Sequence, residues 1–152
     1  MRLVVIGIAL LATAVSSLLA FIVYSGWARE MPEYAALRYP FVTIFLLNIL
    51  PVVFAAFQLF KLLGYIDKKK AFSKLSILAV KKIKYAMLTM TGLYALVLPG
   101  VYLVADKDDA PGLILIGMLF VCAPLSVAIF AAVVQGLFQN AIDLKSENDL
   151  TV

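Results

Sequence analysis

The residues with the most evident chemistry are amines, gathered in one stretch at residues 67–84, DKKKAFSKLSILAVKKIK, beside a single acid, Asp67. The stretch holds seven lysines: Lys68, Lys69, Lys70, Lys74, Lys81, Lys82 and Lys84. Each lysine near an anionic lipid surface contributes about 1 kcal/mol of binding. Because long apolar runs flank the stretch, the positive-inside rule places it in the cytoplasm, on an anionic inner leaflet. A docking site for an acidic protein or for nucleic acid is the alternative, and we do not expect direct nucleic-acid contact.

Catalytic chemistry has few carriers in this sequence. The chain has no histidine, which removes the commonest metal ligand and the commonest general base. Its one cysteine, Cys122, excludes an internal disulfide and a cysteine-cluster metal site. The acids at residues 106–109 lack the ligand spacing of a known calcium loop and predict an external turn. We therefore expect no enzyme activity, no cofactor and no metal.

The composition of the 152 residues indicates an integral membrane protein. Hydrophobic residues make up 64% of the chain and charged residues 14%, against roughly 45–50% and 25% in soluble domains. A chain of this size could not bury so much apolar surface in water, so the bilayer must be part of its solvent.

The hydropathy pattern predicts an all-α integral membrane fold in a single domain, residues 1–152. We expect four transmembrane helices, at about residues 3–24, 41–63, 85–105 and 112–140, and a cytoplasmic tail at 141–152. The spans would form two hairpins joined by a cytoplasmic basic amphipathic helix, with Ser73 as its N-cap, that turns into the third span. A cleaved signal peptide is the alternative for the first run, although that run continues past the candidate cleavage site.

Basic residues predict the orientation. Ten lie in the segments that the four spans place inside, and three lie outside: Arg29, Arg38 and Lys107. Both termini are therefore expected in the cytoplasm.

Several uncharged features inside the spans predict helix packing. The amides of Asn48, Gln58, Gln135 and Gln139 are candidate polar intramembrane contacts. Small residues spaced by four form two candidate packing seams: Ala12, Ser16 and Ala20, then Ala128, Ala132 and Gly136. Prolines predict kinks at Pro51 and Pro124, and a loosened last turn at residues 99–100.

The C-terminal tail is acidic and falls on the same side as the lysines. Its candidate contact residues are Glu147 and Asp149, which we expect either to dock on the basic helix or to repel the lipid surface. Docking is a hypothesis.

The sequence resembles a known family in three places: Phe72-Ser73, residues 80–85 (VKKIKY), and the ending AIDLK followed by ENDLTV at residues 141–152. It is similar to the YoaS-like domain-of-unknown-function family 2975, small four-helix membrane proteins of bacteria. Residues 74–76 depart from the family's pattern, which has an acidic or asparagine-containing turn there. The resemblance implies a bacterial plasma membrane location and a soluble helix-turn-helix regulator as a partner, but no catalytic residue.

The function expected from these observations is a non-catalytic interaction or regulatory component of the membrane. Its expected partners are the lipid bilayer, a homo-oligomer and, by the resemblance only, the helix-turn-helix regulator. The alternative is a small transporter or channel subunit, with the intramembrane amides lining a path. No ionisable residue lies within the spans away from their ends, which weakens the hypothesis of a transporter or channel. A polar cavity between the helices would favour transport, and a closed apolar bundle would favour interaction.

Overall fold

The computed structural model describes residues 2–30, 32, 36, 38–67 and 73–150, and this part of the chain contains helices and no strands. The α-helices are α1 (Arg2–Glu30), α2 (Arg38–Leu47), α3 (Ile49–Asp67), α4 (Lys74–Lys107) and α5 (Gly112–Leu150). The all-α prediction is confirmed.

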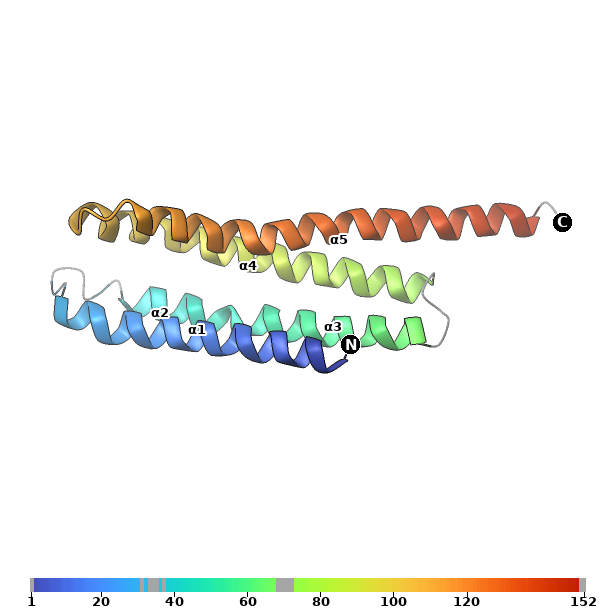
Figure 1. Cartoon of the computed structure of the whole chain (residues 1–152). Coiled ribbons are helices and arrows are strands. Elements are labelled where there is room, and N and C mark those ends of the chain that lie inside the picture. The colour runs from blue at the N-terminus through green and yellow to red at the C-terminus, as the bar shows by residue number, and fades with distance from the viewer. Residues whose placement is uncertain (1, 31, 33–35, 37, 68–72, 151–152) are drawn as a thin grey trace.

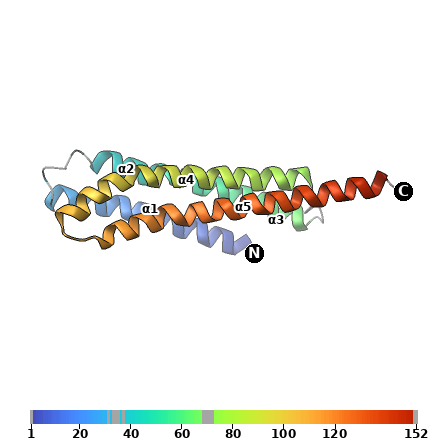
Figure 2. The same ribbon diagram turned by 90° about the horizontal axis from the view of Figure 1, so that it is seen from above.

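The helices run side by side in alternating directions (Figure 1). α1 packs against α2 and α3, α4 packs along α5, and α3 joins the two groups by packing against α4. The N-terminus lies toward the same end of the bundle as the start of α4. The C-terminal end of α5 projects beyond every other helix, as a second view also shows (Figure 2).

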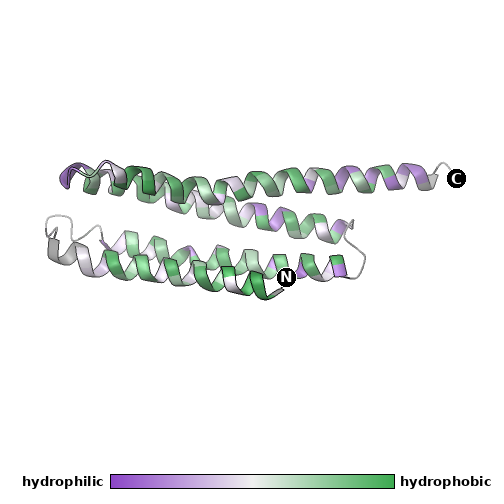
Figure 3. Ribbon diagram, viewed as in Figure 1, coloured by the Kyte–Doolittle hydropathy of each residue, from purple (hydrophilic) through white to green (hydrophobic). Residues whose placement is uncertain are grey.

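Four helical segments of the described chain are long and apolar enough to cross a bilayer: Leu3–Gly26, Arg38–Asp67, Lys74–Lys107 and Gly112–Asn148. Large apolar side chains point outward on them, and Leu3, Leu115 and Phe130 are 82%, 71% and 69% exposed. The hydrophilic residues gather at the two ends of the bundle, most densely on the projecting end of α5 (Figure 3). Such an apolar belt with polar ends suits a lipid solvent.

The second span is longer than predicted and is divided. A single turn residue, Asn48, separates α2 from α3. Pro51 follows three residues later and has no N–H to donate to the carbonyl of Leu47, so the helix cannot continue regularly through this point. The predicted disturbance at Pro51 is therefore present, although it lies one turn earlier.

The basic helix and the third span differ from the expectation of two separate elements. α4 is one helix of 34 residues, with no turn between Lys84 and Tyr85. No glycine or proline interrupts residues 74–91, so nothing in the sequence stops the helix. The expected loosening at residues 99–100 is also wrong, because α4 continues helically past Pro99 to Lys107.

The turn between α4 and α5 is formed by the backbone. Asp109 adopts a positive φ of 48°, the left-handed conformation that ends many helices. The N–H of Ala110 then donates to the carbonyl of Ala105 at 2.9 Å, which satisfies one of the last carbonyls of α4. α5 starts at Gly112 and continues past Pro124, so that proline does not break the helix.

The packed core lies in the half of the bundle next to this turn. Its buried residues are Ala20, Phe41, Phe45, Tyr94 and Val97. The rings of Phe45 and Tyr94 are 6.3 Å apart, and those of Tyr94 and Phe120 are 5.6 Å apart, both tilted. Tilted aromatic pairs at these distances add about 0.5–1.5 kcal/mol beyond their buried area.

The first small-residue seam is buried at two of its three positions, whereas the second is buried at only one. Ser16 and Ala20 are 3% and 5% exposed, and Ser16 lies next to the side chain of Tyr94. Of the second seam only Ala128 is buried, at 1%, while Ala132 and Gly136 face outward. The period of four drifts across a helix of 3.6 residues per turn, which carries the later members off the contact face.

Candidate interaction surface at the lysine-rich end

The lysine-rich end is built on the first turns of α4, and Ser73 positions them. Ser73 has an extended backbone (φ −132°, ψ 156°), and its side chain accepts a hydrogen bond from the N–H of Ser76. This geometry confirms Ser73 as the N-cap; such a cap stabilises a helix by about 1 kcal/mol. Ser76 is fully buried and its hydroxyl lies 3.2 Å from that of Ser73.

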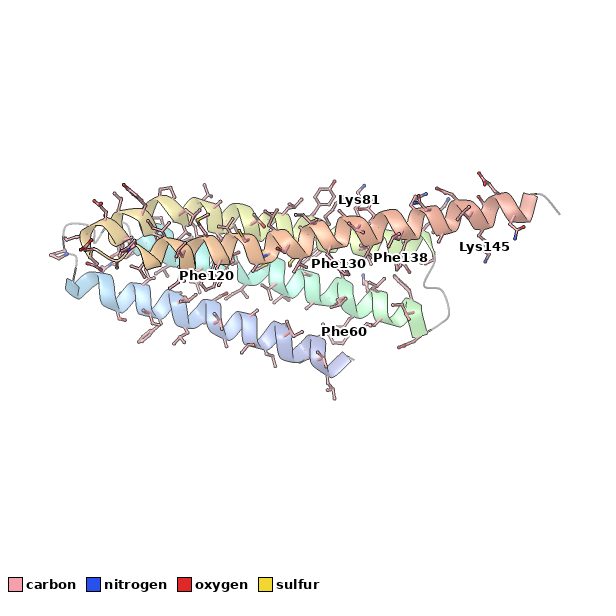
Figure 4. The ribbon with its side chains drawn as sticks, turned by 45° about the horizontal axis from the view of Figure 1, so that its top comes forward. Phe60, Lys81, Phe120, Phe130, Phe138 and Lys145 are labelled. Carbon is pink, nitrogen blue, oxygen red and sulfur yellow. The ribbon has the colours of Figure 1, made fainter. Side chains whose placement is uncertain are left out.

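The predicted lysines that the structure describes differ in exposure. Lys74 and Lys81 are exposed, while Lys82 and Lys84 are half-buried. Lys81 extends away from the bundle (Figure 4). Lys68, Lys69 and Lys70 lie outside the described residues. The described lysines therefore lie within the first three turns of α4, and Lys74, Lys81 and Lys84 share one side of it at 3.6 residues per turn.

Lys84 makes a contact between helices. Its Nζ donates to Oε1 of Gln135 on α5 at 3.0 Å and lies 5.2 Å from the ring centroid of Tyr85. A lysine near the end of a span can extend its amine to a polar partner while its methylene groups stay in the apolar region, which avoids the cost of placing the charge in lipid. Gln135, a predicted polar intramembrane contact, thus binds Lys84, a lysine that the sequence pattern places at the lipid surface.

One turn further toward the tail, α5 offers a second polar group. Nε2 of Gln139 donates to Asp143 at 3.1 Å. A partly open cavity of about 410 Å³ lies between this site and the start of α4. Its lining is Lys74, Ile77, Gln139, Ile142, Asp143 and Ser146. An amine and a carboxylate thus face the same small space from two helices.

The tail is a helix and not a coil. α5 runs to Leu150, and the side chains of Leu144 (67% exposed), Lys145 and Glu147 are all exposed. Lys145 lies on the projecting part of the helix, beyond the other elements (Figure 4). The side chain of Asp149 lies outside the described residues. A helix with an exposed leucine among charges, clear of the bundle, is a surface that a partner can reach.

The other two predicted polar contacts lie inside the bundle. Asn48 is fully buried; its Nδ2 donates to the carbonyl of Ile44 at 3.0 Å, while its Oδ1 has no partner among the described residues. Gln58, ten residues later on α3, is 4% exposed. Asn48 lies at the helix break and Gln58 nearly three turns nearer the lysine-rich end, so the two amides do not form one site.

A second cavity, which sequence reasoning missed, lies between the helices. This groove of about 470 Å³ is lined by α1, α3, α4 and α5, and its side chains are apolar except for the hydroxyl of Tyr94. Its walls include several alanines: Ala9, Ala12, Ala55, Ala56 and Ala123. Only the placement of four helices reveals it, since alanines in an apolar span carry no signal of a cavity.

The described residues contain no cluster of three or more acids, cysteines or histidines that could hold a metal ion. The polar groups that the structure brings together are therefore an amine with an amide, an amide with a carboxylate, and an amine facing a carboxylate. These arrangements bind through charge and hydrogen bonds.

The fold and this surface define an integral membrane protein with four candidate spans. Residues 22–152 match a family described as "Protein of unknown function (DUF2975)". Over 150 residues the chain is also 47% identical to the uncharacterized membrane protein YoaS of Bacillus subtilis (strain 168). The aligned region covers 99% of this chain and 92% of the relative. No solved structure matches the chain. The protein belongs to the DUF2975 family.

Proposed function

We propose that this chain is a non-catalytic membrane protein whose lysine-rich end binds a soluble partner at the cytoplasmic face. The projecting end of α5 carries the proposal, because it presents Leu144 at 67% exposure between polar residues. An apolar anchor surrounded by charges is the usual composition of a protein-binding surface. The family match extends to residue 152, so the tail belongs to the sequence that the family shares.

The length of α5 supports this placement. At 1.5 Å per residue its 39 residues extend about 58 Å, whereas a bilayer with its headgroups is about 40–45 Å thick. The tail therefore stands clear of the lipid, where a soluble protein can approach it. The ten-to-three distribution of basic residues supports a cytoplasmic location for this end.

The cavities favour interaction over transport. A route for ions or polar solutes needs polar or ionisable groups along it. The groove between the four helices is apolar along its described lining except for the hydroxyl of Tyr94. Gln135 and Gln139, the amides on α5, are engaged by Lys84 and Asp143 at the end of the bundle.

The proposal is tested by capture from native membranes in mild detergent. The full chain is compared with a chain ending after Ala141 and with a Leu144→Asp variant. We expect one soluble protein, such as the helix-turn-helix regulator that the family resemblance implies, to come down with the full chain and to be lost from both altered chains. A Leu137→Asn variant, changed at an exposed position on the membrane part of α5, is the control and should retain it. Equal capture by all four chains, or capture of lipid alone, would contradict the proposal.

A further inference from the structure

The apolar groove has two different ends. Its residues nearest the lysine-rich end are Val5, Leu59, Ile83 and Val127, and those farthest from it are Ala12, Val52, Tyr94 and Phe120. On all four helices the lining residues follow one another from the lysine-rich end toward the middle of the bundle, so the groove runs along the bundle axis. We propose that it holds one acyl chain of an anionic phospholipid from the leaflet at the lysine-rich end.

The length of the groove fits one leaflet. Along α4 the lining extends from Ile83 to Tyr94, which is about 16 Å at 1.5 Å per residue. The hydrocarbon core of a bilayer is about 30 Å thick, so each leaflet supplies chains that reach about 15 Å. A chain that enters with its headgroup beside Ile83 therefore ends at Tyr94.

The far end is closed at that depth. The Tyr94 side chain is 8% exposed and lies next to Ser16, and the ring of Phe120 packs on it at 5.6 Å. Beyond the rings of Tyr94 and Phe120 lies the packed core around Phe41 and Phe45. The groove thus ends at the middle of the bundle and does not continue as a channel.

The side of the groove is open to lipid. α1 and α5 do not pack along each other in the described part of the chain. On the two facing walls, Ile8 is 62% exposed and Val127 is 47% exposed. A lipid chain can therefore enter sideways between α1 and α5 while its headgroup stays at the membrane surface.

The volume of the groove suits a slender occupant. A cavity of about 470 Å³ that lies along about 16 Å of α4 has the scale of a single hydrocarbon chain.

A charge at the mouth selects the headgroup. Lys84 follows Ile83 directly on α4, at the lysine-rich end of the groove. The amine of Lys84 gives one hydrogen bond to Gln135, and an ammonium group has three donors, so two stay available. Lys61 on α3 is about 200° around the helix from Leu59, with its amine over the exposed ring of Phe57, so it points away from the groove. The cation of Lys84 at the headgroup level favours an anionic phosphate group without a compensating amine.

The test uses delipidated full-length protein in maltoside micelles, to which phosphatidylglycerol or phosphatidylcholine is added, with bound lipid counted by native mass spectrometry. We expect one phosphatidylglycerol per chain, and binding weakened about fivefold by Lys84→Gln. Ala123→Phe fills the groove from α5 and should lower occupancy at least about tenfold. Ala132→Phe makes the same change on the outward face of the same helix and should bind as the unaltered chain does.

A second groove-filling variant, Ala12→Leu, guards against a folding defect in Ala123→Phe, and circular dichroism melting checks both. Equal occupancy in Ala123→Phe, Ala12→Leu and Ala132→Phe would overturn the proposal. So would equal binding of phosphatidylcholine, retention of free fatty acid in place of phospholipid, or a dimer that dissociates when the groove is filled.

Discussion

The ring of Phe41 in α2 lies directly on the backbone of Gly100 in α4, where any β-carbon would occupy the position of the ring. Gly100 is therefore a contact residue in an unbroken helix. We expect Gly100→Ala to lower the free energy of unfolding by about 1–3 kcal/mol, since the ring must move out of a packed core.

Gly92 provides the control for this prediction, because nothing lies within 4 Å of the position of its β-carbon on the same helix. Gly92→Ala should leave stability unchanged or raise it by up to about 1 kcal/mol through helix propensity. The measurement is thermal or denaturant unfolding in detergent. Adding Phe41→Leu to Gly100→Ala should recover part of the loss; a loss that persists unchanged would show that the contact is not the cause.

Ser16 on α1 and Tyr94 on α4 lie next to each other and so connect the two groups of helices. Ser16→Ala and Tyr94→Phe should each destabilise the fold modestly, and together by less than their sum, with a coupling of about 0.6 kcal/mol. A double-mutant cycle of unfolding free energies measures this coupling. Strict additivity would mean that the two side chains act independently.

Gln135 accepts from a half-buried amine, so its removal leaves a charge without that partner. We expect Gln135→Leu to destabilise the fold by about 1–3 kcal/mol. Gln139→Leu, at an exposed position whose partner Asp143 is also exposed, should cost less than about 1 kcal/mol. Unfolding in detergent compares the two, and a larger effect at Gln139 would contradict the assignment of the contact.

The orientation is tested with single cysteines in a Cys122→Ala background. A membrane-impermeant maleimide should label Asp109→Cys in intact cells, and label Ser146→Cys only after the inner membrane is opened. Ala132→Cys, on the outward apolar face of α5, is the unlabelled control. The opposite labelling order would place both termini outside.

The sequence was sufficient for the helix content and for the number of candidate spans, because runs of uncharged residues longer than about 20 carry that information locally. Ser73 was identified as a cap for the same reason, since capping depends on the next three residues. Pro51 predicts a disturbed helix, although only the structure places the turn at Asn48.

Contacts between distant residues were beyond the sequence. The role of Gly100 depends on where α2 brings Phe41, and the partner of Lys84 lies 51 residues away. The groove has walls from four helices, so no single segment could indicate it. The lysine stretch was assigned to a separate surface helix because its composition resembles one, whereas nothing in residues 74–91 stops the helix that enters the span.

The unbroken length of α5 has a mechanical consequence. A single rod of about 58 Å connects the turn at one end of the bundle to the tail at the other. Transmembrane helices adjust their tilt to the thickness of the bilayer, and a change of about 10° would swing the end of such a rod by about 10 Å. The position of the tail relative to the membrane surface would thus depend on the thickness of the surrounding bilayer.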